Sequence, residues 1–327
     1  MNKTSSTPGQ SIYKLLFSTL PLWCSLLVLV LLGVRQLTSN DLGYHLAFGE
    51  TFFESGKIVD HTPFIYTLPS PGIPESERPE PGPGNWYDDQ GRYRFPNANW
   101  LSQVVIYGAW RLGGIMGLNV LRLILVAGLF VLLTAAMKRS KVSSLLIPPA
   151  LLLVGVTINA RLDLRPELFG YLCLLGQYIM LSKVTIQSGR PSSPSWSWVA
   201  GMVAIQFVFV NLHSYFLLGL AVTGAVLVEY LFAFFKSGMQ VNRSQNSTVC
   251  GTAIYRLGVT LTGMVLVCFV NPWGWRLAFL PLQTLLYMKK YAIGTMEFVA
   301  NAHPWNYIVE FRAFRQQIEE SGMILPS

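Results

Sequence analysis

The sequence predicts an all-α fold: a polytopic transmembrane helix bundle of about seven or more spans with a long first extracytoplasmic loop. Hydrophobic residues make up 52% of the 327 residues, and charged residues make up only 12%. A soluble domain carries roughly twice that charged fraction. Windows of about 20 mostly apolar residues recur along the chain, which is the length that a bilayer requires. The acidic residues also gather on one side of the topology that these windows define.

The apolar windows predict a first span that stays in the protein and six further spans. A short polar N-terminus precedes the first apolar run, and no small-residue cleavage site follows it, which argues against a cleaved leader. Four cysteines without CxxC spacing predict neither a thiolate metal site nor a disulfide framework. The expected spans are 16–36, 115–137, 143–160, 166–183, 196–211, 214–235 and 257–274.

Residues 37–112 form the long first loop, and amphipathic segments at both of its ends predict interfacial helices. The segment 101–112, WLSQVVIYGAWR, is too short to span and is expected to lie at the membrane surface before the second span. The middle of the loop is rich in Pro and Gly. In the C-terminal part, 277–288 is a candidate partial span.

The charge distribution predicts the orientation of the chain. The segments on the side of the N-terminus hold ten Lys and Arg residues and no Asp or Glu, so this side is predicted to be cytoplasmic. The net charge of +8 therefore reflects membrane topology rather than nucleic-acid binding. The acidic residues expected on the opposite side are Asp41, Glu50, Glu54, Asp60, Glu75, Glu77, Glu80, Asp88, Asp89, Asp163, Glu167 and Glu297.

The stretch SNDLGYHLAFGETFFESG, residues 39–56, follows the first span and predicts an amphipathic helix. Asp41 and His45 stand four residues apart and share one face of that helix. One interpretation is structural: Ser39 or Asn40 caps the helix and Asp41 favours its dipole. The other is chemical: Asp41 is a general base at the membrane surface. His45 then orients Asp41, or binds a divalent metal ion with it and with Asp60 and His61.

The stretch NARLDLRPELFGYL, residues 159–172, packs four charges between two apolar segments. Pro166 suits the first turn of the following helix, with Glu167 just inside it. Charges that snorkel to water would explain Arg161 and Asp163. Arg165 and Glu167 stand where the span begins, and ionisable groups at such depth usually face a cavity. Two arginines beside a carboxylate suit a phosphate group.

Three further outer segments hold weaker candidates. The turn VNLHSYF leaves Asn211 and His213 near the outer surface, where they serve as helix caps or as site residues. The stretch VNPWGW, residues 270–275, reads as an interfacial turn. Glu297 and His303 lie in the C-terminal segment.

The order of these segments resembles the catalytic module of the GT-C membrane glycosyltransferases, in the branch of the protein O-mannosyltransferases and the lipid A aminoarabinose transferase. The resemblance covers most of residues 15–300. It lies in an Asp at the start of the first outer loop, the helix YHLAFGETFFESG, and then NANWLSQVVIYGAWRLGGIMGLNVLRL. RLDLRPELFGYL, VNLHSYFLLG and VNPWGW continue it. The chain thus divides into a GT-C-like module, 1–300, and a C-terminal tail, 301–327, that is short for the family.

The resemblance implies an inverting glycosyltransferase in the bacterial inner membrane that acts on the extracytoplasmic face. The donor would be a polyprenyl-phosphate-linked sugar taken from the membrane lipid, with Asp41 as the base and Arg161 and Arg165 on the phosphate. His45, Asp60, His61 and Glu167 would bind an acceptor or a divalent metal ion. Mannosyltransferases typically have an acidic pair, whereas Asp41 is flanked by Asn40 and Leu42, which argues against a protein acceptor.

Two other functional classes compete with this reading. A transporter or flippase of a lipid-linked or anionic substrate would use Glu229, the one carboxylate inside an expected span, for coupling. An inactive accessory membrane subunit would lack a donor cavity beneath Asp41.

Overall fold

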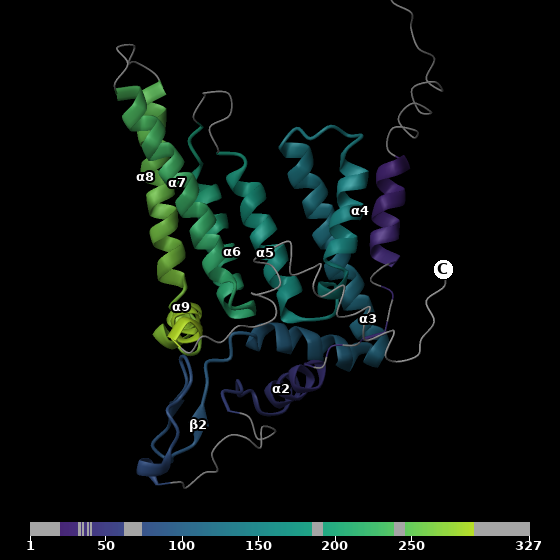
Figure 1. Ribbon diagram of the computed structural model, residues 1–327, viewed down its shortest axis with the longest axis vertical. Coiled ribbons are helices and arrows are strands. Elements are labelled where there is room, and N and C mark those ends of the chain that lie inside the picture. The colour runs from purple at the N-terminus through teal and green to yellow at the C-terminus, as the bar shows by residue number, and fades with distance from the viewer. Residues whose placement is uncertain are drawn as a thin grey trace, which may run out of the picture.

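The computed structural model describes residues 20–31, 34, 36–37, 39, 41–61, 74–184, 192–238 and 246–290. These residues form a helical bundle with a short two-stranded sheet at one end (Figure 1). The helix Leu20–Leu31 comes first. The other helices are α2 Leu42–Ser55, α3 Trp100–Arg139, α4 Ile147–Thr157, α5 Pro166–Leu181, α6 Trp196–Leu212, α7 Phe216–Gly238, α8 Asn246–Val267 and α9 Trp275–Lys290. Two 3-10 turns, η1 Glu75–Glu77 and η2 Asn159–Arg161, and the antiparallel strands β1 Trp86–Tyr87 and β2 Tyr93–Arg94 complete the described elements.

Three helices of the described chain are long and apolar enough to cross a membrane: Trp100–Arg139, Phe216–Lys236 and Val249–Val267. The other four expected spans coincide with shorter helices. Helix α4, for example, has 11 residues and is therefore only about 16 Å long. The expected span 257–274 is displaced, because α8 begins at Asn246 and ends at Val267. Pro272 prevents the helix from continuing through the Asn271 turn.

Helix α3 consists of two segments that meet at a sharp kink. Gly113 leaves the helical region, and Gly114 has φ 55° and ψ −137°, a backbone conformation that only glycine adopts readily. The chain folds back so tightly that a Cβ on Gly117 would lie 2.0 Å from the carbonyl oxygen of Ala109. The segment 101–112 therefore lies across one end of the bundle, while the rest of α3 runs along it (Figure 1).

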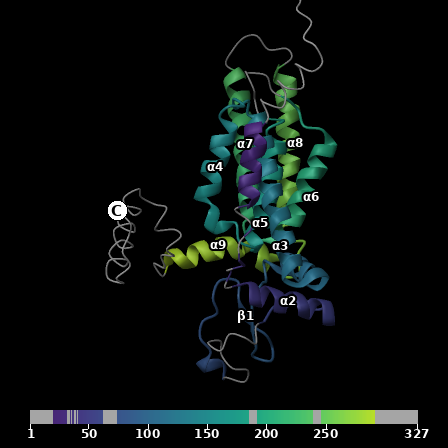
Figure 2. The ribbon, with the colours of Figure 1, turned by 90° about the vertical axis from the view of Figure 1, so that its right-hand side faces the viewer.

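Helix α2, the β-hairpin and α9 all lie at the end of the bundle where α3 bends, which we call the α2 end (Figures 1 and 2). Helix α9 lies across this end in Figure 2, so the 277–288 segment is not a partial span within the bundle. Pro166 occupies the first turn of α5 and Glu167 follows it, as the sequence predicted. The end of α3 and the turns after α3 and α5 lie at the opposite end (Figure 1). Lys138 and Arg139 belong to the last turn of α3, and Lys141 and Lys183 follow α3 and α5.

Three apolar clusters stabilise the bundle in the described part of the chain, one of them around Phe209, Phe216 and Leu277. Helices α3, α4 and α5 share one cluster, in which Val126, Leu151 and Leu168 are fully buried. Helices α6, α7 and α8 share a second cluster around Met202 and Leu257. The polar groups that matter below lie where the first cluster meets the α2 end.

Candidate functional site at the α2 end

Asp41 begins α2, but its side chain does not cap the helix. It occupies the N-cap position with φ −86° and ψ −12°, and its carboxylate accepts no capping hydrogen bond. Within the described residues the carboxylate forms no hydrogen bond or ion pair at all, although Asp41 is partly buried. Ser39, one of the two expected caps, has a buried hydroxyl without a hydrogen-bond partner in the described chain, and Asn40, the other, lies outside the described residues.

A close approach of α2 to α3 positions His45. A Cβ on Gly49 would lie 2.4 Å from Tyr107 Cβ and 2.5 Å from the Gln103 carbonyl oxygen, so only glycine fits there. One turn earlier, His45 is 2% exposed and its Nδ1 lies 3.2 Å from Gln103 Nε2. Gln103 Oε1 accepts in turn a 2.7 Å hydrogen bond from Asn97 Nδ2.

The turn between α4 and α5 divides its four charged residues between two roles. Asp163 is 3% exposed and lies 3.5 Å from Arg122 Nη1, so it forms a buried ion pair with α3. Arg161 Nη1 lies 3.9 Å from Glu167 Oε1. Arg165 is partly buried, and its Nε is buried without a hydrogen-bond partner. Among the described residues Arg165 forms no hydrogen bond or ion pair.

These elements meet in the apolar core, where Leu42 and Leu46 of α2 pack against the cluster that contains Leu168 of α5 and Leu212 at the end of α6. The pKa of Tyr44 is raised to about 12, first by desolvation and then by Asp41 and Glu167, while Arg165 opposes the shift. Tyr44 is 39% exposed, so it borders the site rather than lying within it.

Burial lowers the pKa of His45 to about 4, and the nearby charges of Arg165 and His213 lower it further. Helix α2, the start of α5 and the α6–α7 turn thus converge on one place. We call this group the Asp41–Arg165 cluster; its members are Asp41, Tyr44, His45, Arg165, Glu167 and His213.

The two candidates in the α6–α7 turn have different surroundings. His213 is 7% exposed, packs against Gly170 of α5, and belongs to the cluster. Asn211 instead ties the fold together: its Oδ1 accepts from Trp100 Nε1 at 2.9 Å, and its Nδ2 donates to the carbonyls of Phe207 and Val270. We therefore assign Asn211 a structural role.

Asp60 and His61 do not join the cluster. Asp60 pairs with Arg94 of β2, and His61 Nδ1 lies 3.2 Å from Asp60 Oδ1. In the described ranges, no three His, Cys, Asp or Glu side chains are arranged to hold a metal ion. The hairpin uses Asp60 for its own contacts with Arg94 and His61. Asn40, Glu297 and His303 lie outside the described residues.

Sequence reasoning missed three polar residues near the site. Tyr44 borders the cluster, Gln103 contacts His45, and Arg122 is fully buried. A signal existed for Arg122, a charged residue within an apolar run, because such residues in a membrane protein usually have a specific partner.

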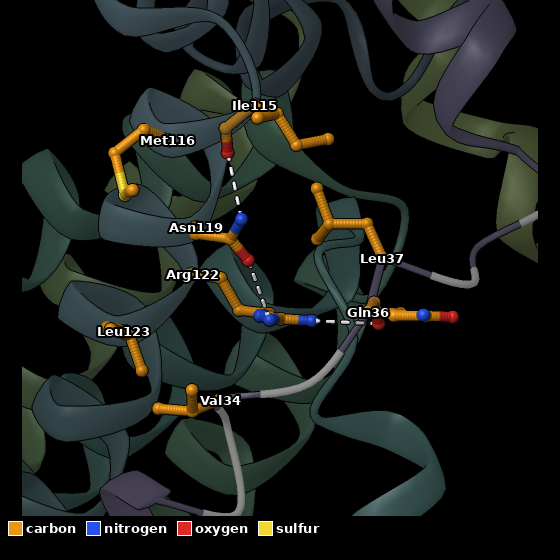
Figure 3. A pocket seen from close by; sticks show the side chains of 8 residues that line it. All are labelled: Val34, Gln36, Leu37, Ile115, Met116, Asn119, Arg122 and Leu123. Carbon is orange, nitrogen blue, oxygen red and sulfur yellow. Dashed lines mark hydrogen bonds between the residues drawn. The ribbon is translucent and has the colours of Figure 1, made fainter.

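A groove of about 670 Å³ lies on α3 just after the kink (Figure 3). Its walls are mainly aliphatic, including Ile115, Met116 and Leu123. At its polar side, Asn119 Oδ1 accepts from Arg122 Nη2 at 2.8 Å, and Arg122 Nη1 donates to the Gln36 carbonyl at 3.3 Å.

The groove is linked to the cluster by two short stretches of chain. Leu37, which lines the groove, precedes Asp41 by four residues. Arg122 pairs with Asp163, which precedes Arg165 by two residues.

No protein-family model, no curated protein and no solved structure matches this chain.

Proposed function

We propose that the protein is a membrane glycosyltransferase that moves a sugar from a polyprenyl-phosphate donor to an acceptor hydroxyl at the extracytoplasmic face. One observation supports this proposal above the others. Asp41 and Arg165 lie in one partly buried cluster, and neither forms a hydrogen bond or ion pair within the described chain. Such a transfer uses a carboxylate to accept a proton and a guanidinium to stabilise the leaving phosphate.

The two groups divide the reaction between them. Asp41 accepts the proton of the acceptor hydroxyl as its oxygen attacks the anomeric carbon. The bond from that carbon to the phosphate oxygen breaks, and the configuration inverts. The phosphate takes the bonding electrons and leaves as an anion, which Arg165 stabilises as the charge develops. Arg161 and Glu167 line the approach, with Glu167 orienting the acceptor through a hydrogen bond.

The groove on α3 suits the hydrocarbon chain of the donor. Its aliphatic walls offer an apolar surface of the kind that a lipid chain buries, and Arg122 at its polar side pairs with Asp163, two residues before Arg165. In this proposal the hydrocarbon chain of the donor lies against Met116 and Leu123, and its phosphate binds at Arg165.

Replacing the base provides the direct test. Asp41→Asn is expected to lower transfer by about 10²- to 10⁴-fold, the range that a general base contributes. The assay is sugar transfer from a polyprenyl-phosphate donor in proteoliposomes, with expression and thermal melting as checks of folding. Asp60→Asn is the matched control, because that carboxylate pairs with Arg94 in the hairpin. Full transfer by the Asp41→Asn variant would contradict the proposal.

The transporter alternative makes a different prediction about Glu229. This residue lies on α7 and is exposed, whereas coupling carboxylates usually face a bundle interior. Substrate uptake that is lost in Glu229→Gln and retained in Asp41→Asn would favour a transporter. An accessory subunit would show neither activity in the wild-type protein.

A further inference from the structure

Both buried histidines of the cluster use Nδ1 as a hydrogen-bond acceptor. In the α6–α7 turn the backbone N–H of Tyr215 lies 3.2 Å from His213 Nδ1. A backbone N–H can only donate, so Nδ1 of His213 carries no proton. The neutral ring therefore holds its proton on Nε2.

A chain of two amides defines the tautomer of His45 in the same way. Asn97 Nδ2 donates to the Val59 carbonyl at 3.1 Å, and Asn97 Oδ1 accepts from the Asn99 backbone N–H at 3.2 Å. These backbone groups fix which end of the Asn97 amide is the nitrogen.

The orientation of the next amide follows from the first. Because Asn97 Nδ2 donates to Gln103 Oε1, the nitrogen of Gln103 is the atom that faces His45. Gln103 Nε2 therefore donates to His45 Nδ1, and His45 also holds its proton on Nε2. Neither Nε2 has an acceptor among the residues that the structure describes.

We propose that His45 and His213 are fixed Nε2–H donors that, together with Arg165, form a binding site for the oxygens of a phosphate ester. This inference deepens the proposed function, since it assigns the place of the donor phosphate. It gives the histidines the role of donors rather than that of bases or metal ligands.

The surroundings favour the neutral donor form of both rings. Arg165 and His213 face His45, and burial lowers the pKa of His45 and of His213 to about 4 in each case. Both rings are then uncharged near neutral pH, so they add hydrogen bonds without further positive charge. Asp41, whose charge acts on Tyr44, remains available to the acceptor.

The same geometry argues against metal binding by His45. A metal on Nε2 would require the proton to move to Nδ1, where it would oppose the N–H of Gln103. The amide cannot turn over to accept this proton without losing its bond from Asn97.

The test is nitrogen NMR of the full chain in nanodiscs with ¹⁵N-labelled histidine and butyl phosphate as the probe. The one-bond N–H coupling identifies the protonated nitrogen of each ring, and His45→Gln and His213→Gln assign the signals. We expect coupling at Nε2 of both rings and downfield shifts of both Nε2 protons on addition of butyl phosphate. His61, which is exposed and pairs with Asp60, is the internal control and should not shift. Coupling at Nδ1 of either ring, or no shift with butyl phosphate, would overturn the inference.

Two substitutions of Gln103 test the hydrogen-bond chain from Asn97 through Gln103 to His45, which we call the relay. Gln103→Glu offers His45 an acceptor, so we expect the proton to move to Nδ1 and butyl phosphate to bind about tenfold more weakly, the effect of one charge-assisted hydrogen bond. Gln103→Met adds no charge and should leave both tautomers populated, with an intermediate loss. An unchanged His45 tautomer in Gln103→Glu would refute the relay. Butyl phosphate binding without any sugar transfer would refute the proposed function while leaving this site intact.

Discussion

The β-hairpin and the Asp41–Arg165 cluster lie at the same end of the molecule, yet they differ in whether their charged side chains form ion pairs. In the hairpin, Arg94 pairs with both Asp60 and Asp88. Asp88 also accepts hydrogen bonds from the backbone of Arg92. In the cluster, Asp41 and Arg165 have no such partner among the described residues.

We infer from this difference that the hairpin charges stabilise a loop, whereas Asp41 and Arg165 bind a ligand. Partly buried charges without partners are costly, and a fold retains them where a ligand supplies the missing interaction. Asp60 and Arg165 look alike in the sequence, since each stands beside a second ionisable residue or close to one. Their surroundings give them different roles.

The largest expected effect concerns the ion pair that lies between the cluster and the groove. Arg122 and Asp163 have side chains that are 1% and 4% exposed. Arg122→Met would leave Asp163 as an uncompensated buried charge, and we expect it to lower the free energy of unfolding by about 3–5 kcal/mol. The double variant Arg122→Met, Asp163→Leu should recover most of the loss in the same denaturation assay. If the Arg122→Met variant is as stable as wild type, the Arg122–Asp163 pair does not stabilise the fold.

A matched pair of arginine substitutions tests the comparison directly. Arg165→Gln is expected to reduce transfer by about 10²- to 10³-fold, because a preorganised donor to the leaving anion is lost, with little change in melting temperature. Arg94→Gln should give the reverse, a lower melting temperature with transfer intact, because its partners are Asp60 and Asp88. The comparison fails if the two variants behave alike.

A smaller effect is expected where α2 crosses α3. Gly49→Ala would place a Cβ 2.5 Å from the Gln103 carbonyl oxygen, so the helices must separate. We expect a loss of about 1–3 kcal/mol in the free energy of unfolding, which is typical of overpacking. Gly43→Ala, at a position of α2 with open space around it, is the control and should have no such cost.

The smallest effect is a difference in pH dependence. The pKa of both cluster histidines falls from 6.5 to about 4 on folding, so the unfolded chain takes up these protons first. The stability from their burial is present above pH 6.5 and is lost as the pH falls through 4.

In the hairpin, desolvation alone would raise the pKa of Asp88, but hydrogen bonds from Arg92, Arg94 and Gln90 outweigh it and lower the pKa below its ordinary 3.8. Its contribution is therefore present above about pH 4 and is lost only in stronger acid. Melting curves of wild type, His213→Gln and Asp88→Asn between pH 7 and 3 should separate the two ranges. Loss of stability over the same pH range in both variants would contradict the separate contributions of the histidines and of Asp88.

Much of the fold could be predicted from local patterns. Each expected span overlaps a helix, because an apolar run of helical length folds the same way whatever surrounds it. The bend in α3 was implied by the boundary between the expected interfacial segment and the following span, where Gly113 and Gly114 stand. The end of α8 was misplaced. The apolar run continues past Val267, where the helix ends, because hydropathy alone does not register the helix-breaking Pro272.

The candidate site could be predicted only in part. Residue type and position were enough to select Asp41, His45, Arg165 and Glu167. Ionisable groups at the start of an apolar helix usually face a cavity, a ligand or a charged partner. Whether they lie together depends on how α2, α5 and the α6–α7 turn pack, which no local pattern contains.

The sequence alone determined the helices, the separation of charge and the residue types available for chemistry, since these follow from hydropathy and charge counted along the chain. Only the tertiary structure decided which charges are already paired. Asp60 finds Arg94 across 34 residues, and His45 finds Gln103 across 58. Such contacts depend on how distant segments pack, and they distinguish an ion pair that maintains a loop from a charge that is free to bind.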